Sequence, residues 1–172
     1  LINSVRELLP DFSVRTDVIV GYPGETEEDY EETMSLMRIV RFDTAFMFYY
    51  SEREGTLAAR KKPDDVPLAD KKRRLAALIA QQEQISYEVN QTHIGREHEV
   101  LVLGPTRRNP TQAMGRSSCF RMTVFELGDH HPGDLIRVRI LRATSHTLFG
   151  ELIEVINHAP RGEALSAIGL HV

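Results

Sequence analysis

The stretch TDVIVGYPGET, residues 16–26, decides the fold class of the first half of the chain. Its continuous β-branched run from Val18 to Val20 is typical of a strand in a parallel sheet that is covered on both faces. Two glycines and a proline follow directly, and they predict a tight turn in which the backbone can approach another group closely. Thr26 and Asp29 then have the spacing of a helix cap, so the stretch predicts a strand, a turn and a helix.

The sequence downstream of this turn completes a strand–helix–strand unit. Residues 27–41 repeat apolar side chains at helical spacing, at Tyr30, Met34, Met37 and Val40. Residues 45–50 are rich in aromatics and predict a second strand, followed by the loop 51–56. In such a unit the loops after both strands lie at the edge where parallel sheets bind ligands. A unit of this size cannot bury both faces of its sheet, so we expect it to close a larger barrel or sheet.

A long amphipathic helix is predicted after the polar segment 63–67, in which Pro67 suits the first helical position. Its apolar stripe consists of Leu75, Leu78, Ile79, Ile85 and Val89, and we expect the helix to end at Gly95. The basic run 71–74 on this helix has two interpretations. We favour a solvated face that pairs with neighbouring acids, and the alternative is a contact to RNA phosphates.

The second half of the chain changes to alternating patterns that predict five short strands. We expect them at residues 99–103, 112–116, 122–126, 135–141 and 148–155. Alternation is clearest in the fourth, where Ile136 and Val138 lie on one face while Arg137 and Arg139 lie on the other. Five strands in about sixty residues predict a small closed barrel of the oligonucleotide-binding kind.

The charge of the chain is divided unevenly between the two halves. The 172 residues carry a net charge of −4, yet residues 94–150 contain eight arginines, no lysine and five acids. Arginine donates in a planar fork and stacks on bases, so this composition favours contacts to phosphate and nucleobase, although a solvated barrel surface has the same composition. The candidates for RNA contact are Arg107, Arg108, Arg116, Arg121, Arg137 and Arg139.

The composition also limits which classes of protein the chain can belong to. No run of about eighteen apolar residues predicts a membrane span. The single cysteine, Cys119, cannot form a disulfide framework, and alone it cannot hold an iron–sulfur cluster. We therefore expect a cytoplasmic protein without membrane association, and we also expect it to be monomeric. The chain begins at Leu1 without the pattern of a signal peptide, and we interpret it as part of a longer chain.

Four segments in a fixed order resemble one enzyme family, the radical S-adenosylmethionine methylthiotransferases. Residues 17–26 are similar to a strand and loop late in the barrel of that family, and residues 50–59, YSEREGTLAA, match its YSxRxGTxAA motif one unit later. Two further matches follow: the segment that starts the family's connecting helix, at residues 64–67, and the family's basic run, at residues 71–75. The closing barrel resembles the TRAM domain of these enzymes.

The resemblance implies an α/β region followed by an all-β region. Residues 1–66 would form the C-terminal part of a radical S-adenosylmethionine barrel, which is TIM-like, and residues 67–93 a connecting helix. Residues 94–156 would form a TRAM barrel that binds RNA, followed by the tail 157–172.

The resemblance also implies a reaction, its cofactors and its partner. Such enzymes add a methylthio group to C2 of N6-isopentenyladenosine beside the anticodon of tRNA, using S-adenosylmethionine and two [4Fe-4S] clusters. The cofactors carry this radical chemistry. The cysteines that hold the clusters would lie upstream of Leu1, so we assign no catalytic and no metal-binding residue here. Residues that the resemblance places near S-adenosylmethionine are Gly21, Pro23, Gly24, Glu25, Ser51 and Arg53.

Two details of this resemblance have alternatives. Arg53 suits a carboxylate or phosphate in the full site, or equally a structural ion pair with Glu25 or Glu52. The family's Gly-Arg pair stands at residues 115–116, but the Asn that usually follows a few residues later is absent. Residues 119–121, Cys-Phe-Arg, stand in that place, so the chain departs from the family pattern at this local RNA contact.

Two further functions are consistent with parts of the sequence. A sister enzyme methylthiolates an aspartate of a ribosomal protein, and its barrel carries an acidic stretch after the Gly-Arg pair. Residues 117–124 contain Arg121 and no acid here, which favours RNA. A non-catalytic RNA-binding module would bind tRNA with salt-dependent affinity and show no affinity for S-adenosylmethionine.

Overall fold

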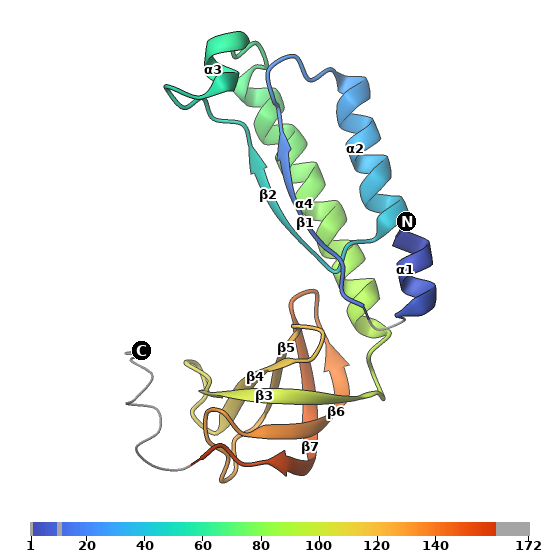
Figure 1. The fold of residues 1–172 in the computed structure, drawn as a ribbon, viewed down its shortest axis with the longest axis vertical. Helices are drawn as coiled ribbons and strands as arrows, with labels where there is room; N and C mark the ends of the chain where they lie inside the picture. Colours follow the sequence, from blue (N-terminus) through green and yellow to red (C-terminus); the bar gives the residue numbers. More distant parts are fainter. Residues whose placement is uncertain (1, 10–11, 161–172) are drawn as a thin grey trace. The chain divides into compact units, whose positions relative to one another are not determined.

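A computed structural model of the chain describes residues 2–9 and 12–160. The chain divides into two compact units, residues 1–89 and residues 90–172, and each is described by itself (Figure 1). Within the described ranges, no helix combines the length and the apolar character that a membrane span requires.

The first unit is built on the predicted strand–helix–strand element. Its elements are α1 (Ile2–Leu8), β1 (Arg15–Val20), α2 (Glu27–Val40), β2 (Thr44–Tyr49), α3 (Leu57–Lys61) and α4 (Leu68–Gln91). The last two residues of α4 belong to the second unit. β1 and β2 pair in parallel over their whole length. The hydroxyl of Thr26 accepts a hydrogen bond from the Asp29 amide at 3.1 Å, and the Asp29 carboxylate accepts one from the Thr26 amide at 2.9 Å. This reciprocal cap starts α2 where the sequence predicted it.

α2 and α4 pack on one face of the sheet and form the core of the first unit. The predicted stripe of α2 is buried at Tyr30, Met34, Met37 and Val40. On α4, Leu78 and Ile85 are buried in the same core, but Ile79 is 36% exposed, so the predicted stripe was wrong there. Ile79 lies roughly 100° around the helix from Leu78, which turns it out of the buried face. α4 also ends at Gln91 rather than at Gly95.

The opposite face of the sheet is uncovered in the part of the chain that the structure describes. Ile19, Phe46 and Phe48 are 56%, 57% and 54% exposed. Alternate side chains of a strand point to opposite faces, so these three share the face turned away from the helices. The strand that the sequence predicted to be covered on both faces is therefore covered here on one.

The second unit is a closed five-stranded barrel, as the sequence predicted. Its strands are β3 (Glu97–Pro105), β4 (Gln112–Ser117), β5 (Met122–Glu126), β6 (Leu135–Ala143) and β7 (Thr147–Asn157). They close in the order β3-β4-β5-β7-β6, with β5 and β7 as the parallel pair. Four of the five strands run longer than predicted. A Cβ at Gly115 would overlap the backbone of Leu101, so glycine allows β3 and β4 to approach at that point.

A buried carboxylate secures the end of β7 to the barrel. Asp134 is fully buried and accepts hydrogen bonds from the amides of His131 at 3.0 Å and Ala159 at 2.8 Å. β7 continues to Asn157, so the first residue of the predicted tail belongs to the barrel, and the Asp134 carboxylate holds the chain beyond it at Ala159. The remainder of that tail, residues 161–172, lies outside the described residues.

Loss of the Asp134 charge is expected to destabilise the barrel. The backbone hydrogen bond from His131, together with that from Ala159, lowers the pKa of Asp134 from 3.8 to about 2. Its folded pKa lies below its unfolded pKa, so the stabilisation is complete above pH 3.8 and is lost as the pH falls through about 2. We expect Asp134→Asn to lower the free energy of unfolding of the second unit by about 2 kcal/mol at neutral pH.

Thermal unfolding between pH 2 and pH 7 measures this effect. The matched control is Asp129→Asn, which removes an exposed carboxylate from the same loop and leaves the melting temperature unchanged. Equal melting temperatures of Asp134→Asn and the wild-type chain across this range would show that the hydrogen bonds to Asp134 do not stabilise the barrel.

Candidate functional site

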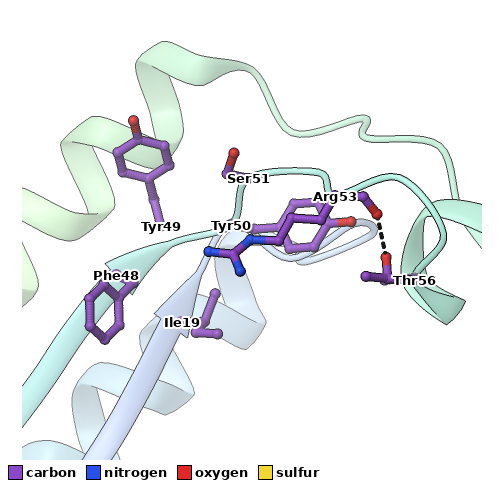
Figure 2. A pocket seen from close by; sticks show the side chains of 8 residues that line it. Ile19, Phe48, Tyr49, Tyr50, Ser51, Arg53 and Thr56 are labelled. Atoms are coloured by element: carbon purple, nitrogen blue, oxygen red, sulfur yellow. Dashed lines mark hydrogen bonds between the residues drawn. The ribbon is translucent and has the colours of Figure 1, made fainter.

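A cavity of about 490 Å³ lies at the carboxyl ends of β1 and β2 (Figure 2). This is the edge of a parallel sheet at which ligands bind. The side chains that line it are Ile19, Phe48, Tyr49, Tyr50, Ser51, Arg53, Thr56 and Ala58. Apolar walls with a few polar groups are the usual composition of a small-molecule site.

Thr56 shapes the segment that carries the polar side chains of the cavity. Its hydroxyl donates to the carbonyl oxygen of Arg53 at 2.8 Å and accepts from the Ala59 amide at 3.3 Å, which starts α3 (Figure 2). Ser51 and Arg53 are exposed and line the cavity. Among the described residues, the Arg53 guanidinium has no ion pair, so the alternative of a structural pair with Glu25 or Glu52 has no support in this geometry.

Tyr50 forms the wall between the two strand ends. Its amide donates to the Val20 carbonyl at 2.8 Å, and its ring meets Tyr22 edge to face with the centroids 5.4 Å apart. The hydroxyl is buried without a hydrogen-bond partner among the described residues, and burial raises the pKa of Tyr50. A buried hydroxyl is costly to leave unpaired, so it is suited to a polar contact with a bound molecule.

The turn after β1 is held by the chain's own side chains. Gly21 has a φ of 71° and donates its amide to the Glu25 carboxylate at 2.6 Å. Gly24 donates its amide to the Asp65 carboxylate at 2.7 Å. The predicted cofactor residues of this turn, Gly21, Pro23, Gly24 and Glu25, are not among those that line the cavity. Their contact with S-adenosylmethionine stays a prediction.

Two basic residues of α4 are buried under these loops, so the predicted solvation is wrong for them, whereas the predicted pairing with neighbouring acids is confirmed. Lys71 is 3% exposed, and its ammonium donates to the Asp64 carboxylate at 2.5 Å and to the Tyr50 carbonyl at 3.2 Å. Arg74 is 5% exposed and donates to the Glu25 carboxylate at 2.6 Å. Both residues share the helix face of Leu78, three or four residues apart along it, which explains their burial.

Close packing against Lys71 also accounts for the glycine at position 21. A Cβ at Gly21 would overlap the Lys71 side chain, and the positive φ of Gly21 disfavours other residues there. The glycine is thus required by the packing of the chain itself.

The predicted RNA-contact arginines lie at three places on the barrel. Arg107 and Arg108 are in the β3–β4 loop, Arg116 and Arg121 flank the β4–β5 hairpin at the other end of β4, and Arg137 and Arg139 are on β6. In the β3–β4 loop, the Thr106 hydroxyl donates to the Asn109 carbonyl at 2.8 Å, which fixes the loop. Arg107, Arg108 and Arg116 are exposed and form no ion pair with another described residue.

The two arginines of β6 point outward as predicted, but glutamates of the neighbouring strands neutralise them. The ion pairs are Arg137 with Glu154 at 2.7 Å and with Glu99 at 3.6 Å, and Arg139 with Glu97 at 2.9 Å and with Glu151 at 3.7 Å. The register of β3, β6 and β7 places these residues opposite one another. This face therefore attracts a phosphate backbone less than the loops do.

The sequence interpretation missed a polar cluster beneath the β4–β5 hairpin. Cys119 is buried with its sulfur 3.2 Å from the Ser117 hydroxyl, and the rings of His93 and His98 meet with nitrogens 3.0 Å apart. Burial opposes ionisation of the Cys119 thiol, but hydrogen bonds from His98 and Ser117 outweigh it and lower its pKa to about 7. The cluster combines residues from the turn after α4, from β3, and from β4 with its hairpin turn, and no local pattern in the sequence signals it.

Residues 91–153, which make up most of the second unit, match the TRAM domain family. The match covers β3 to β6 and the first part of β7, and it is to the domain family that the closing barrel was expected to resemble.

Over most of its length the chain is similar to the C-terminal region of curated tRNA-2-methylthio-N(6)-dimethylallyladenosine synthases. It is 50% identical over 149 residues to the synthase of Chlorobium luteolum, and the aligned stretch covers 87% of this chain and 33% of that protein. It is 45% identical over 153 residues to the synthase of Parabacteroides distasonis, 89% of this chain and 34% of that protein. The chain spans about one third of the length of these relatives. The resemblance to the methylthiotransferase family is confirmed.

Removal of the Arg74 guanidinium is expected to destabilise the first unit. Arg74→Ala leaves the Glu25 carboxylate, whose side chain is 11% exposed, without its buried cation. Breaking a buried ion pair from one side costs about 3 kcal/mol, which we expect as the loss in free energy of unfolding. Lys72→Ala, on the exposed side of the same helix turn, is the control and should change little.

Urea denaturation combined with hydrogen exchange of β1 and β2 measures this loss. Equal stabilities of the Arg74→Ala and Lys72→Ala variants would show that the buried pair does not hold the strand ends.

Proposed function

We propose that this chain is the C-terminal portion of a tRNA methylthiotransferase that uses S-adenosylmethionine. In this proposal the enzyme adds a methylthio group to C2 of N6-isopentenyladenosine beside the anticodon. The observation that carries it is the 50% identity over 149 residues to a synthase of this name. That match is longer than either unit, so both the α/β unit and the barrel take part in it.

The uncovered sheet face supports a larger barrel around the first unit. Ile19, Phe46 and Phe48 expose a contiguous apolar surface on β1 and β2, which suits further strands or interior side chains of a barrel. We propose that residues 1–66 are the last part of a radical S-adenosylmethionine barrel and that residues 67–93 connect it to the TRAM domain.

The cavity supports binding of part of S-adenosylmethionine. Apolar walls suit its adenosine and methionine carbon atoms, while Ser51 and the unneutralised Arg53 suit its hydroxyl and carboxylate groups. The turn with Gly21, Pro23, Gly24 and Glu25 lies after the neighbouring strand, and Arg74 fixes it through Glu25. In this proposal Ser51, Arg53 and the turn residues bind and orient the cofactor, and Arg74 only holds the turn in place.

The iron–sulfur clusters, when bound to such an enzyme, would supply the electron that cleaves S-adenosylmethionine and the sulfur chemistry. The described residues contain no group of three side chains suited to a metal ion, and the sequence has one cysteine. The donor set for a cluster is thus not met by this chain, and we derive no step through the clusters.

RNA binding is assigned to the loops of the barrel. Arg107, Arg108 and Arg116 offer exposed guanidinium groups without ion pairs to described residues, and Arg121 lies beside Arg116 at the hairpin. Phosphate contacts of this kind position an RNA and make its affinity depend on salt. Arg137 and Arg139 would contribute less because glutamates already neutralise them.

The isolated chain is expected to bind an anticodon stem-loop RNA with an affinity that falls as salt rises. Combined Arg107→Ala and Arg108→Ala should lower the slope of log affinity against log salt by about 1.5, because two phosphate contacts are lost. Combined Arg137→Ala and Arg139→Ala, the matched pair on β6, should change it less. Fluorescence anisotropy at several salt concentrations measures both, and a wild-type chain that binds no RNA would overturn the proposed RNA-binding role.

Arg53 is expected to bind S-adenosylmethionine in the longer protein. Arg53→Ala should raise the KM for S-adenosylmethionine about tenfold, the usual effect of losing one charge-assisted hydrogen bond. Arg60→Ala, an exposed arginine on α3 that does not line the cavity, should leave it unchanged. Isothermal titration with the cofactor provides a second readout, and equal affinities of the two variants would contradict the assignment.

A further inference from the structure

We infer that the guanidinium of Arg142, on the outer face of the barrel, stacks on an unpaired base of the bound RNA. The inference rests on the proposed function and deepens it, because it names a residue of the barrel that meets a base rather than a phosphate. Arg142 is not among the arginines to which the sequence analysis assigned an RNA contact.

An aromatic ring holds Arg142 in place. Its guanidinium carbon lies 3.7 Å from the centroid of the Phe149 ring, and the strand register sets the two residues opposite each other on β6 and β7. Phe149 is half-buried in the sheet, whereas Arg142 is exposed. A guanidinium is planar, so the face that is turned away from the ring can receive a second planar group such as a nucleobase.

The strand register continues this pair into a row across the outer face of the barrel. Phe149 pairs with Val124 of β5, and Val124 pairs with Met114 of β4. All three are half-buried and lie next to fully buried residues of their strands, so their side chains face outward. In barrels of the oligonucleotide-binding kind, the second and third strands, here β4 and β5, carry the face that binds nucleic acid. Arg142 thus lies at the end of an apolar platform on that face.

The charge of this platform suits RNA. The neighbouring row consists of Arg116, Met122 and Thr147. The two rows together therefore carry two arginines and no acid, and Arg142 forms no ion pair with another described residue. The next outward residues on β5 and β7 are acids that already have partners. Glu126 accepts a hydrogen bond from Gln112 at 3.3 Å, and Glu151 pairs with Arg139 at 3.7 Å. An arginine plane beside apolar side chains, without a competing acid, is an arrangement that binds unpaired bases.

Arg142→Lys separates base stacking from the other roles of this residue. Lysine keeps the positive charge and a cation over the Phe149 ring, but it has no planar group to stack on a base. The variant should therefore melt near the wild-type temperature and keep the wild-type slope of log affinity against log salt. Its affinity for the anticodon stem-loop RNA should fall about tenfold, since one base loses its stacking partner.

Two controls are matched to this variant. Arg139→Lys makes the same change on the same strand, at an arginine that Glu97 and Glu151 neutralise, and should leave the affinity unchanged. A fully paired RNA duplex offers no unpaired base, so Arg142→Lys should bind it as tightly as the wild-type chain does. Fluorescence anisotropy with both RNAs at several salt concentrations measures these affinities and slopes.

The outcomes distinguish the inference from the proposed function. A wild-type chain that binds the stem-loop, together with an Arg142→Lys variant that binds it equally well, would overturn the stacking role alone. An equal loss of affinity for the stem-loop and the duplex would also overturn it, because Arg142 would then contact phosphates. A wild-type chain without affinity for RNA would overturn both.

Discussion

The two cations buried on α4 hold the first unit in the form that creates its cavity. Lys71 and Arg74 cannot leave water without partners, and their partners are groups of the loops that follow β1 and β2. Lys71 binds the Tyr50 carbonyl, where β2 ends, and Arg74 binds Glu25, which in turn receives the Gly21 amide. One helix face thereby fixes both strand ends, and the segment with Ser51 and Arg53 extends beside them.

This arrangement separates the polar groups of the strand ends into two sets. Glu25 and the glycine turn are used in the structure itself, whereas Arg53 and the Tyr50 hydroxyl have no such partner among the described residues. The barrel shows the same separation. Arg137 and Arg139 are neutralised by glutamates, whereas Arg107, Arg108 and Arg116 are not. In both units the arginines that no acid among the described residues neutralises are the ones that remain available to an anionic ligand.

Local signals in the sequence predicted much of the fold. The Thr26 cap, the apolar stripe of α2 and the alternating strands of the barrel all depend on residues a few positions apart, and the structure has them where expected. Burial of Lys71 was missed because its partner Asp64 and the Tyr50 carbonyl come from other segments. The glutamates beside Arg137 and Arg139 depend on strand register, which alternation alone does not fix. The family resemblance singled out Ser51 and Arg53, and both line the cavity at the strand end. The resemblance did not reveal that Glu25 of the first turn forms an ion pair within the chain.

Hydrogen exchange of the chain with and without an anticodon stem-loop RNA tests most directly whether the barrel loops hold RNA. The account predicts slower exchange in the β3–β4 loop and the β4–β5 hairpin when RNA is present, with unchanged exchange in α2. Protection confined to the Arg137 and Arg139 face, or no protection anywhere in the barrel, would contradict it.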